Sequence, residues 1–157
     1  MIIMFSKEEK KLIDFAKKAF PKFIMNRRKK GVLDTIYACI ISDSGKIYEG
    51  KPFEPKNCSG TICCERVAIA DMAFKETEKA RVKAVLVMGP VGKGGHLTPC
   101  GLCRDVIHEY SGGKATVLCA GGFFERKDAN FDFLFKNIEK YTIKELYPHP
   151  WSEGKWT

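Results

Sequence analysis

Three cysteines and one glutamate stand at spacings that suit a catalytic metal site. Cys63 and Glu65 are two apart in the segment T-I-C-C-E-R, and Cys100 and Cys103 are three apart in the segment T-P-C-G-L-C-R. Zinc sites that only hold a fold have four protein ligands, whereas catalytic zinc sites offer three and leave the fourth position to water. Three thiols and a nearby carboxylate therefore predict an open zinc site.

The order of these two motifs is more specific than either motif alone. A lone C-x-x-C is shared by redox motifs and structural zinc motifs. C-x-E followed downstream by P-C-x-x-C is the three-cysteine form of the zinc-deaminase signature, in which the glutamate lies outside the metal shell. In that chemistry Glu65 takes a proton from water and returns protons to the ring nitrogen and to the departing ammonia. The pattern indicates a deaminase of an aminated heteroaromatic ring.

Other side chains could replace members of this set. Cys64 could replace Cys63 as a ligand, although the motif needs one residue between ligand and glutamate. A fourth thiol from Cys64 or Cys58 would make a structural zinc clasp, and Glu65 would then be a surface carboxylate. Two histidines near the motifs are better explained as surface or core residues than as ligands, namely His96 and His108.

Three thiolates give the zinc site a net negative charge, which positive groups must offset. Arg66 and Arg104 each follow a motif residue directly, so hydrogen bonds from them to sulfur would draw charge off the metal. Arg104 could equally be an ordinary surface residue. Thr98 is expected to cap the helix that Pro99 opens rather than to react.

Length and composition predict one globular enzyme domain. The chain has 157 residues, of which 45% are apolar and 11% aromatic, and we expect a single domain over 1–157. The first residues are too few for a signal peptide, and no apolar run approaches the roughly 18 residues of a membrane span, so we expect a cytoplasmic protein. The cysteine count of seven favours reduced thiols. Those outside the motif set are expected to be small core residues: Cys39, Cys58, Cys64 and Cys119.

The net charge of +8 raises the question of nucleic-acid binding. Most lysines near the start of the chain interleave with apolar residues at helical spacing, which is typical of a solvated helix face. The true cluster is Arg27-Arg28-Lys29-Lys30, and it has no adjoining aromatic platform of the kind that single strands need. Nucleic acid is therefore not the expected partner.

Alternating patterns along the chain predict its helices and strands. Ser6 and Glu9 form a capping box before an apolar stripe, which predicts a helix over 7–20 that ends near Pro21 and is followed by a basic loop. The order of the elements predicts a mixed sheet with helices on its faces. The later elements are a hairpin of 35–42 and 46–49, a loop over 50–61, a helix over 62–79, a strand over 82–88, a Gly-rich loop over 89–98, a helix opened by Pro99, a strand over 115–120, a short strand over 131–135 and a helical turn over 142–146.

With these residues laid out, the chain resembles the cytidine deaminase family of pyrimidine salvage, with blasticidin deaminases as close relatives. C-C-E-R-V-A-I at 63–69 is similar to the family's C-A-E-R-T-A-I, and T-P-C-G-L-C-R-D-V at 98–106 is similar to S-P-C-G-x-C-R-Q-V. G-K-I-Y-E-G at 45–50 resembles the family's G-R-I-F-x-G strand, and T-I-K-E-L-Y-P at 142–148 resembles its closing T-x-x-E-L-L-P.

The resemblance implies a fold, a metal and a reaction. The fold is a three-layer α/β/α arrangement with a mixed five-stranded sheet. The reaction is zinc-dependent deamination of cytidine or deoxycytidine to uridine or deoxyuridine plus ammonia, in a homotetramer whose active sites are completed by neighbouring chains. The implied roles are zinc ligands for Cys63, Cys100 and Cys103, proton shuttle for Glu65, and thiolate-bonding arginine for Arg66.

The chain departs from the family where the substrate would bind. The family holds the ribose 3′-hydroxyl with an asparagine and a glutamate two apart, and here those positions are Pro52 and Glu54. Proline offers neither an amide side chain nor a backbone donor. Asp34 stands where the family has an aromatic that stacks on the base. Trp151 falls where the family places an aromatic that reaches toward a neighbour's site, although simple packing would explain it equally well.

These departures leave the substrate open. Asp34 could meet a positive group on a modified or aminoacyl nucleoside, as in a blasticidin-like deaminase. A nucleic-acid-editing deaminase would use the basic cluster, but a cysteine as first ligand and the short chain argue against it. A zinc-stabilised binding module would leave Glu65 without a purpose.

Overall fold

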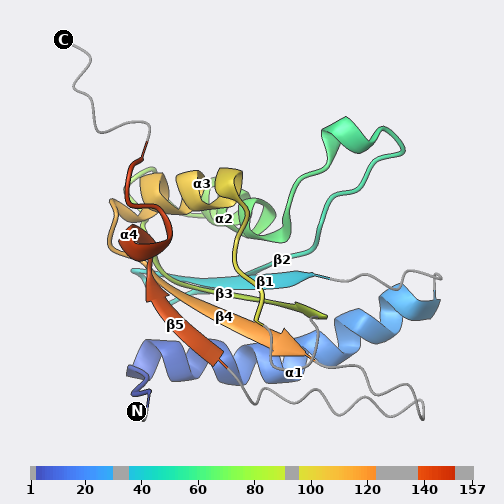
Figure 1. Ribbon diagram of the computed structural model, residues 1–157, viewed down its shortest axis with the longest axis horizontal. Coiled ribbons are helices and arrows are strands. Elements are labelled where there is room, and N and C mark those ends of the chain that lie inside the picture. The colour runs from blue at the N-terminus through green and yellow to red at the C-terminus, as the bar shows by residue number, and fades with distance from the viewer. Residues whose placement is uncertain (1–2, 30–35, 91–95, 123–137, 151–157) are drawn as a thin grey trace.

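The structure is a computed structural model that describes residues 3–29, 36–90, 96–122 and 138–150. Five strands and four α-helices alternate along these ranges, with one 3₁₀ turn (Figure 1). In chain order they are α1 (Lys7–Lys29), β1 (Tyr37–Ser42), β2 (Ile47–Gly50), η1 (Cys58–Gly60), α2 (Cys64–Lys75), β3 (Val82–Pro90), α3 (Gly101–Ser111), β4 (Thr116–Gly122), β5 (Ile138–Thr142) and α4 (Ile143–Leu146).

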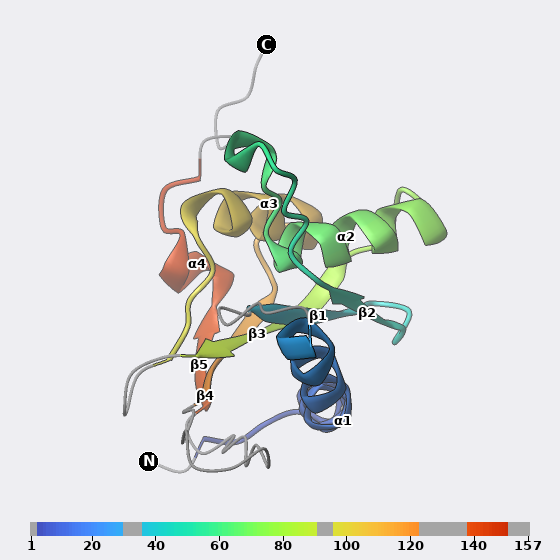
Figure 2. The same ribbon diagram turned by 90° about the vertical axis from the view of Figure 1, so that its right-hand side faces the viewer.

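The strands form one mixed sheet in the order β2-β1-β3-β4-β5. β3 and β4 are parallel and are joined through α3, while the other neighbouring pairs are antiparallel. Helix α1 covers one face of the sheet, and α2 and α3 cover the other (Figure 2). The predicted three-layer α/β/α fold with a mixed five-stranded sheet is confirmed.

The central strands are buried on both faces, so their sequences are nearly continuous apolar runs. All six residues of β1 are buried, with alternate side chains directed to opposite layers. Cys39 belongs to the core between the sheet and α1, whereas Cys119 on β4 belongs to the core beneath α2 and α3. Both thiols are thus the small core residues that the sequence predicted, and the Cys58 side chain lies outside what the structure describes.

Helix α1 does not end near Pro21, as the sequence predicted, but continues to Lys29. An interior proline costs a helix about 3 kcal/mol because it lacks an N–H donor and clashes with the preceding turn. Phe20, directly before the proline, and Phe23, two residues after it, are nevertheless buried. Their ring centroids lie 5.7 and 5.5 Å from that of Tyr37. Burial of each large apolar side chain contributes about 1.5–3 kcal/mol, which offsets the proline. The expected basic loop is therefore the last turns of a helix.

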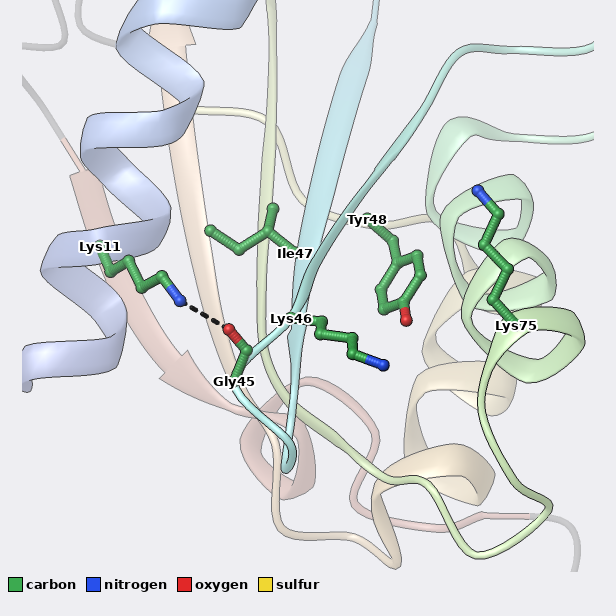
Figure 3. Close-up of a pocket in the computed structure, with 6 residues that line it drawn as sticks. All are labelled: Lys11, Gly45, Lys46, Ile47, Tyr48 and Lys75. Atoms are coloured by element: carbon green, nitrogen blue, oxygen red, sulfur yellow. Dashed lines mark hydrogen bonds between the residues drawn. The ribbon is translucent and has the colours of Figure 1, made fainter.

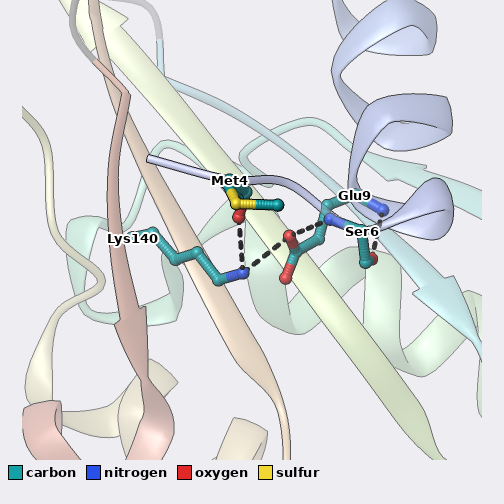
Figure 4. Close-up of polar contacts among 4 residues, drawn as sticks. All are labelled: Met4, Ser6, Glu9 and Lys140. Carbon is teal, nitrogen blue, oxygen red and sulfur yellow. Dashed lines mark hydrogen bonds and ion pairs between the residues drawn. The ribbon is translucent and has the colours of Figure 1, made fainter. Parts of the chain in front are cut away.

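The start of α1 is fixed by a reciprocal capping box and an ion pair (Figure 4). The Ser6 N–H donates to Glu9 Oε2 at 2.8 Å, and the Glu9 N–H donates to Ser6 Oγ at 3.2 Å. Glu9 is almost fully buried, and its Oε2 also accepts from Lys140 Nζ of β5 at 2.8 Å. Lys140 Nζ donates to the Met4 carbonyl as well. This cluster ties the N-terminal helix to an edge strand.

The β1–β2 hairpin turns at Gly45, whose φ of +80° favours glycine. Lys11 of α1 donates through Nζ to the Gly45 carbonyl at 2.6 Å. The edge strand β2 is flanked here by an open hollow of about 580 Å³, which we call the lysine hollow (Figure 3). Its lining residues are Lys11, Gly45, Lys46, Ile47, Tyr48 and Lys75.

The other predicted elements differ from the structure mainly at their ends. Helix α2 begins at Cys64 and ends at Lys75, several residues short of the predicted 79, and Pro99 precedes α3 instead of opening its first turn. Strand β5 was not predicted, and the predicted strand at 131–135 lies outside the described residues. The predicted helical turn is confirmed as α4, whose capping box joins Thr142 and Glu145. None of the helices in the described ranges has the length and apolar character needed to span a bilayer.

Candidate active site

Two helix N-termini meet above the sheet, and each begins at a cysteine. Cys63 is the N-cap of α2 and Cys100 is the N-cap of α3, both with extended backbone dihedrals, while Cys103 lies in the first turn of α3. Helix N-termini carry partial positive charge and free N–H groups, which stabilise thiolates. The sequence placed both motifs at loop-to-helix junctions, and the structure confirms that placement.

The three sulfurs form a compact cluster. They all lie within 4.8 Å of one another, with 3.7 Å between the Sγ atoms of Cys63 and Cys100 and 3.5 Å between those of Cys100 and Cys103. Tetrahedral zinc with Zn–S bonds of about 2.3 Å requires sulfur separations of about 3.8 Å. In the part of the chain that the structure describes, no other group of three metal-binding side chains lies this close. The donor set fits zinc.

The three thiols differ in their acidity. Burial raises the pKa of Cys63, and the neighbouring Arg66 opposes this rise. Burial, reinforced by the Glu65 charge, raises the pKa of Cys103 well above its ordinary value. Burial also acts on Cys100, but hydrogen bonds from Cys103 and Cys63 outweigh it and leave the Cys100 pKa lowered. Metal binding would therefore have to displace protons from the buried thiols.

Arg66 carries a buried donor beside the sulfurs. Its Nη2 donates to the Thr61 carbonyl at 3.4 Å, but its buried Nε–H has no hydrogen-bond acceptor among the described residues. A buried unsatisfied donor is costly. The charge of Arg66 interacts with the thiols of Cys63 and Cys103, so thiolates on a metal would supply the acceptor that Nε lacks.

Glu65 is buried next to the sulfur cluster and contacts the spare cysteine of the motif. Only 3% of Glu65 is exposed, and Cys64 Sγ donates to its Oε2 at 3.2 Å. Burial and the Glu65 charge raise the pKa of Cys64, which keeps it a thiol and therefore a donor. Cys64 is thus directed at the carboxylate and is not a member of the sulfur cluster.

A cavity of about 360 Å³ opens onto Glu65 and the two N-cap thiols. That volume falls within the roughly 300–1,000 Å³ of small-molecule sites. Two of the substrate-contact residues that the resemblance implied, Pro52 and Glu54, lie in its wall, whereas Asp34 and Trp151 lie outside the described residues. The lining residues are Ile36, Pro52, Glu54, Thr61, Cys63, Cys64, Glu65, Leu97, Thr98 and Cys100.

The unexpected extension of α1 brings Arg27 to this cavity. Arg27 Nη2 lies 2.6 Å from Glu54 Oε2 in an ion pair, and only 16% of the arginine side chain is exposed. The sequence assigned Arg27 to a basic cluster in a loop. The apolar residues beyond Pro21 were the available signal, because they continue the helical stripe toward Arg27.

Arg104 stabilises the loop before α3 instead of bonding sulfur. It donates to the Pro99 carbonyl at 2.8 Å, to the Leu146 carbonyl at 3.1 Å and to Thr98 Oγ1 at 3.2 Å. The sequence predicted that Thr98 caps α3. This prediction is wrong, because Cys100 occupies the N-cap. His96 hydrogen-bonds with the Tyr141 hydroxyl at 3.2 Å and lies outside the sulfur cluster.

Gly50 fixes the height of α2 above the sheet. It ends β2, and a Cβ added at this residue would overlap the backbone carbonyl oxygen of Cys64. Only glycine allows the strand and the helix start to approach so closely. The position of Cys63, Cys64 and Glu65 therefore depends on the absence of a side chain at residue 50.

Comparison with known proteins agrees with this geometry. Residues 10–120 match the family model described as the cytidine and deoxycytidylate deaminase zinc-binding region. A cytidine deaminase of Sporosarcina psychrophila is 29% identical over 118 residues, covering 74% of each chain. The fold is similar to the crystal structure of the cytidine deaminase from Bacillus anthracis, with a TM-score of 0.60 at 20% identity, covering 94% of this chain and 91% of that one. The cytidine deaminase of Burkholderia pseudomallei gives a TM-score of 0.59 at 20% identity, covering 74% and 81%.

The family match covers more than half of the chain. The protein therefore belongs to the cytidine and deoxycytidylate deaminase family, a family of hydrolytic deaminases.

Proposed function

We propose that the protein catalyses zinc-dependent hydrolytic deamination of a cytidine-type pyrimidine nucleoside, releasing ammonia and leaving a uridine-type product. The observation that carries the proposal is a cluster of three sulfurs, two of which line the same cavity of nucleoside size as the Glu65 carboxylate. The family match and the cytidine deaminase relatives support the same reaction class.

In this proposal Cys63, Cys100 and Cys103 hold the metal, and Arg66 stabilises their thiolates. A zinc ion bound there supplies a Lewis acid that lowers the pKa of water from about 15.7 to about 7. Glu65 accepts a proton from the attacking water and delivers protons to the ring nitrogen and to the leaving amine. Its burial excludes bulk water, and the Cys64 thiol holds one carboxylate oxygen in place.

The cavity wall supports a pyrimidine nucleoside with altered contacts to the sugar. Glu54 can accept a hydrogen bond from a substrate hydroxyl, whereas Pro52 offers no side-chain amide. Loss of a buried hydrogen-bond partner costs about 1–3 kcal/mol. Cytidine is therefore expected to bind more weakly than it would to a pocket that has an asparagine at this position.

Ammonia release tests this function directly. Purified zinc-loaded protein is incubated with cytidine, deoxycytidine, cytosine and an aminoacyl-cytosine nucleoside, and the deaminated product is identified by its absorbance and mass. We expect turnover of at least one cytosine nucleoside and a loss of about 10²–10⁴-fold in kcat for Glu65→Gln. The exposed carboxylate variant Glu109→Gln on α3 is the matched control and should retain activity. Absence of deamination across the panel, or less than a tenfold loss in Glu65→Gln, would contradict the proposal.

We further propose that the chain works in pyrimidine salvage in the cytoplasm as a homotetramer. Large exposed apolar side chains stand at one lining residue of the cavity and at two residues adjacent in sequence to lining residues, and they support burial against another chain. These are Ile36, Phe53 and Ile62, with 40%, 57% and 37% exposed. Sedimentation equilibrium of the zinc-loaded protein tests the assembly, and a monomer at micromolar concentration would contradict it.

A further inference from the structure

We infer that Arg27 makes the open end of the cavity select a substrate that carries an anionic group, of the cytosine nucleoside monophosphate class, over the uncharged nucleoside. The inference rests on the proposed function, because it concerns the far end of the same substrate. Its physical basis is the balance of charge between the interior of the cavity and its open end.

The described lining of the cavity contains acids and thiols but no lysine or arginine. Its ionisable side chains are Glu54 and Glu65 together with three cysteine thiols. Such a lining disfavours a negatively charged substrate unless a cation from outside the lining reaches it. Arg27 is positioned to do so, since its guanidinium lies 2.6 Å from the Glu54 carboxylate.

The Arg27–Glu54 pair changes what the open end can bind. A lone Glu54 would repel a phosphate, but its charge is cancelled by Arg27. A second cation stands nearby, because Lys51 Nζ lies 5.6 Å from the Phe23 ring centroid and Arg27 Cζ lies 6.0 Å from the same centroid. A second carboxylate, Glu49, accepts from the Tyr37 hydroxyl at 3.0 Å, and the Tyr37 ring centroid lies 5.5 Å from that of Phe23. The two cations therefore balance two carboxylates at this end, in contrast to the acidic lining of the cavity.

The arrangement also orients the substrate. In the proposed function the amine-bearing ring binds beside Glu65 and the thiols, at the buried end of the cavity. The opposite end of the substrate then lies near Glu54, whose side chain is 47% exposed. A guanidinium offers several N–H donors in a planar fork that matches phosphate oxygens. The side chain of Arg27 is mostly buried against Phe23 and is therefore held in place for this contact.

The experiment compares kcat/KM for cytidine and for cytidine 5′-monophosphate, with the deoxy pair as a second set. We expect the wild type to prefer the monophosphate by about tenfold or more, equivalent to about 1.4 kcal/mol. Arg27→Met should lower that preference by about tenfold, while Arg27→Lys keeps the charge and should retain most of it. Glu54→Gln leaves the guanidinium uncompensated and should strengthen the preference.

Lys83→Met is the matched control. It removes an ion pair with Glu8, which lies about 28 Å from Arg27 along α1, and should leave the preference unchanged. Should Arg27→Met fail to fold, raising the salt from about 0.05 to about 0.5 M with wild-type protein must lower the preference, because salt screens exposed charges.

The outcomes separate this inference from the proposed function. Deamination of cytidine without preference for the monophosphate, or a preference unchanged in Arg27→Met and insensitive to salt, would overturn the role of Arg27 and leave the proposed function standing. Failure to deaminate either compound would overturn both. A larger loss of kcat/KM for the monophosphate than for cytidine in Arg27→Met would support the inference.

Discussion

Two hollows in the described part of the chain contrast in size and in chemistry. The lysine hollow at the β2 edge has a volume of about 580 Å³, and the cavity at the start of α2 and α3 has a volume of about 360 Å³. In the larger one Lys11 donates to the Gly45 carbonyl and Lys75 pairs with Asp71, so two of its three lysines already have partners within the chain. The smaller one is lined by two of the clustered thiols and a buried carboxylate, and the unsatisfied Arg66 Nε–H lies in the same helix start, directly after Glu65.

The difference shows that volume alone does not identify the candidate active site. Lysines beside an edge strand protect it from pairing with other chains, which is a structural role. Polar groups that are buried and unsatisfied are costly, and a fold keeps them where a metal or substrate completes them. The following predictions test this contrast.

The largest effect is expected for Cys100→Ser. Serine is a poor zinc ligand compared with a thiolate, so the variant should lose zinc and activity together. The loss of affinity should exceed the roughly 100-fold that removal of an outer-shell partner costs. Metal analysis of the purified variant measures the occupancy, and Cys119→Ser in the sheet core is the thiol control that should retain zinc. Near-full zinc in Cys100→Ser would refute the ligand assignment.

Gly50→Ala and Gly45→Ala form a matched pair of glycine substitutions. The added Cβ at Gly50 would overlap the Cys64 carbonyl and displace the start of α2, so this variant should lose about 1–3 kcal/mol of unfolding free energy together with zinc occupancy. At Gly45 nothing lies within 4 Å of the added Cβ, and the positive φ alone costs about 1–2 kcal/mol. Urea denaturation and zinc content measured on both variants separate stability from site geometry. Full zinc and activity in Gly50→Ala would show that the close approach is not required.

A smaller effect is expected when Pro52 of the cavity wall is changed, together with Asp34, toward the pattern that the resemblance implied. Pro52→Asn combined with Asp34→Phe should raise kcat/KM for cytidine by about tenfold for each 1.4 kcal/mol of recovered contact. Steady-state rates on cytidine measure the change. Efficient cytidine turnover by the unmodified protein, near the upper end of roughly 10⁴–10⁸ M⁻¹s⁻¹, would contradict an altered pocket.

The smallest effects are expected in the lysine hollow. Lys46→Met and Lys75→Met should change kcat/KM by less than about twofold, because surface substitutions away from a site shift free energies by about 0.5 kcal/mol or less. Loss of the exposed pair with Asp71 should lower the unfolding free energy by only about 0.3–0.5 kcal/mol. A large loss of activity in either variant would give the lysine hollow a functional role and erase the contrast between the two regions.

Prediction from the sequence succeeded where the signal is local. The hairpin around Gly45, the cap at Ser6, the helical turn after Thr142, and the helix starts near Cys63 and Cys100 all follow from a few adjacent residues. Strand β5 was missed because Ile138–Thr142 alternates weakly, and its partner β4 defines it through pairing. The end of α1 was misplaced because a local proline rule was outweighed by burial of Phe20 and Phe23 against a distant strand.

The sequence by itself determined the chemical groups of the site. C-x-E and P-C-x-x-C are short-range patterns, and each places its side chains on one helix start whatever surrounds them. Tertiary structure decided which groups meet. The order β2-β1-β3-β4-β5 brings the starts of α2 and α3 together, and the absence of a side chain at Gly50 lets α2 settle onto the sheet. Packing of α1 past Pro21 carries Arg27 to Glu54. The apolar stripe past the proline signals a longer helix, but the partner that Arg27 meets depends on how distant segments pack in the whole core.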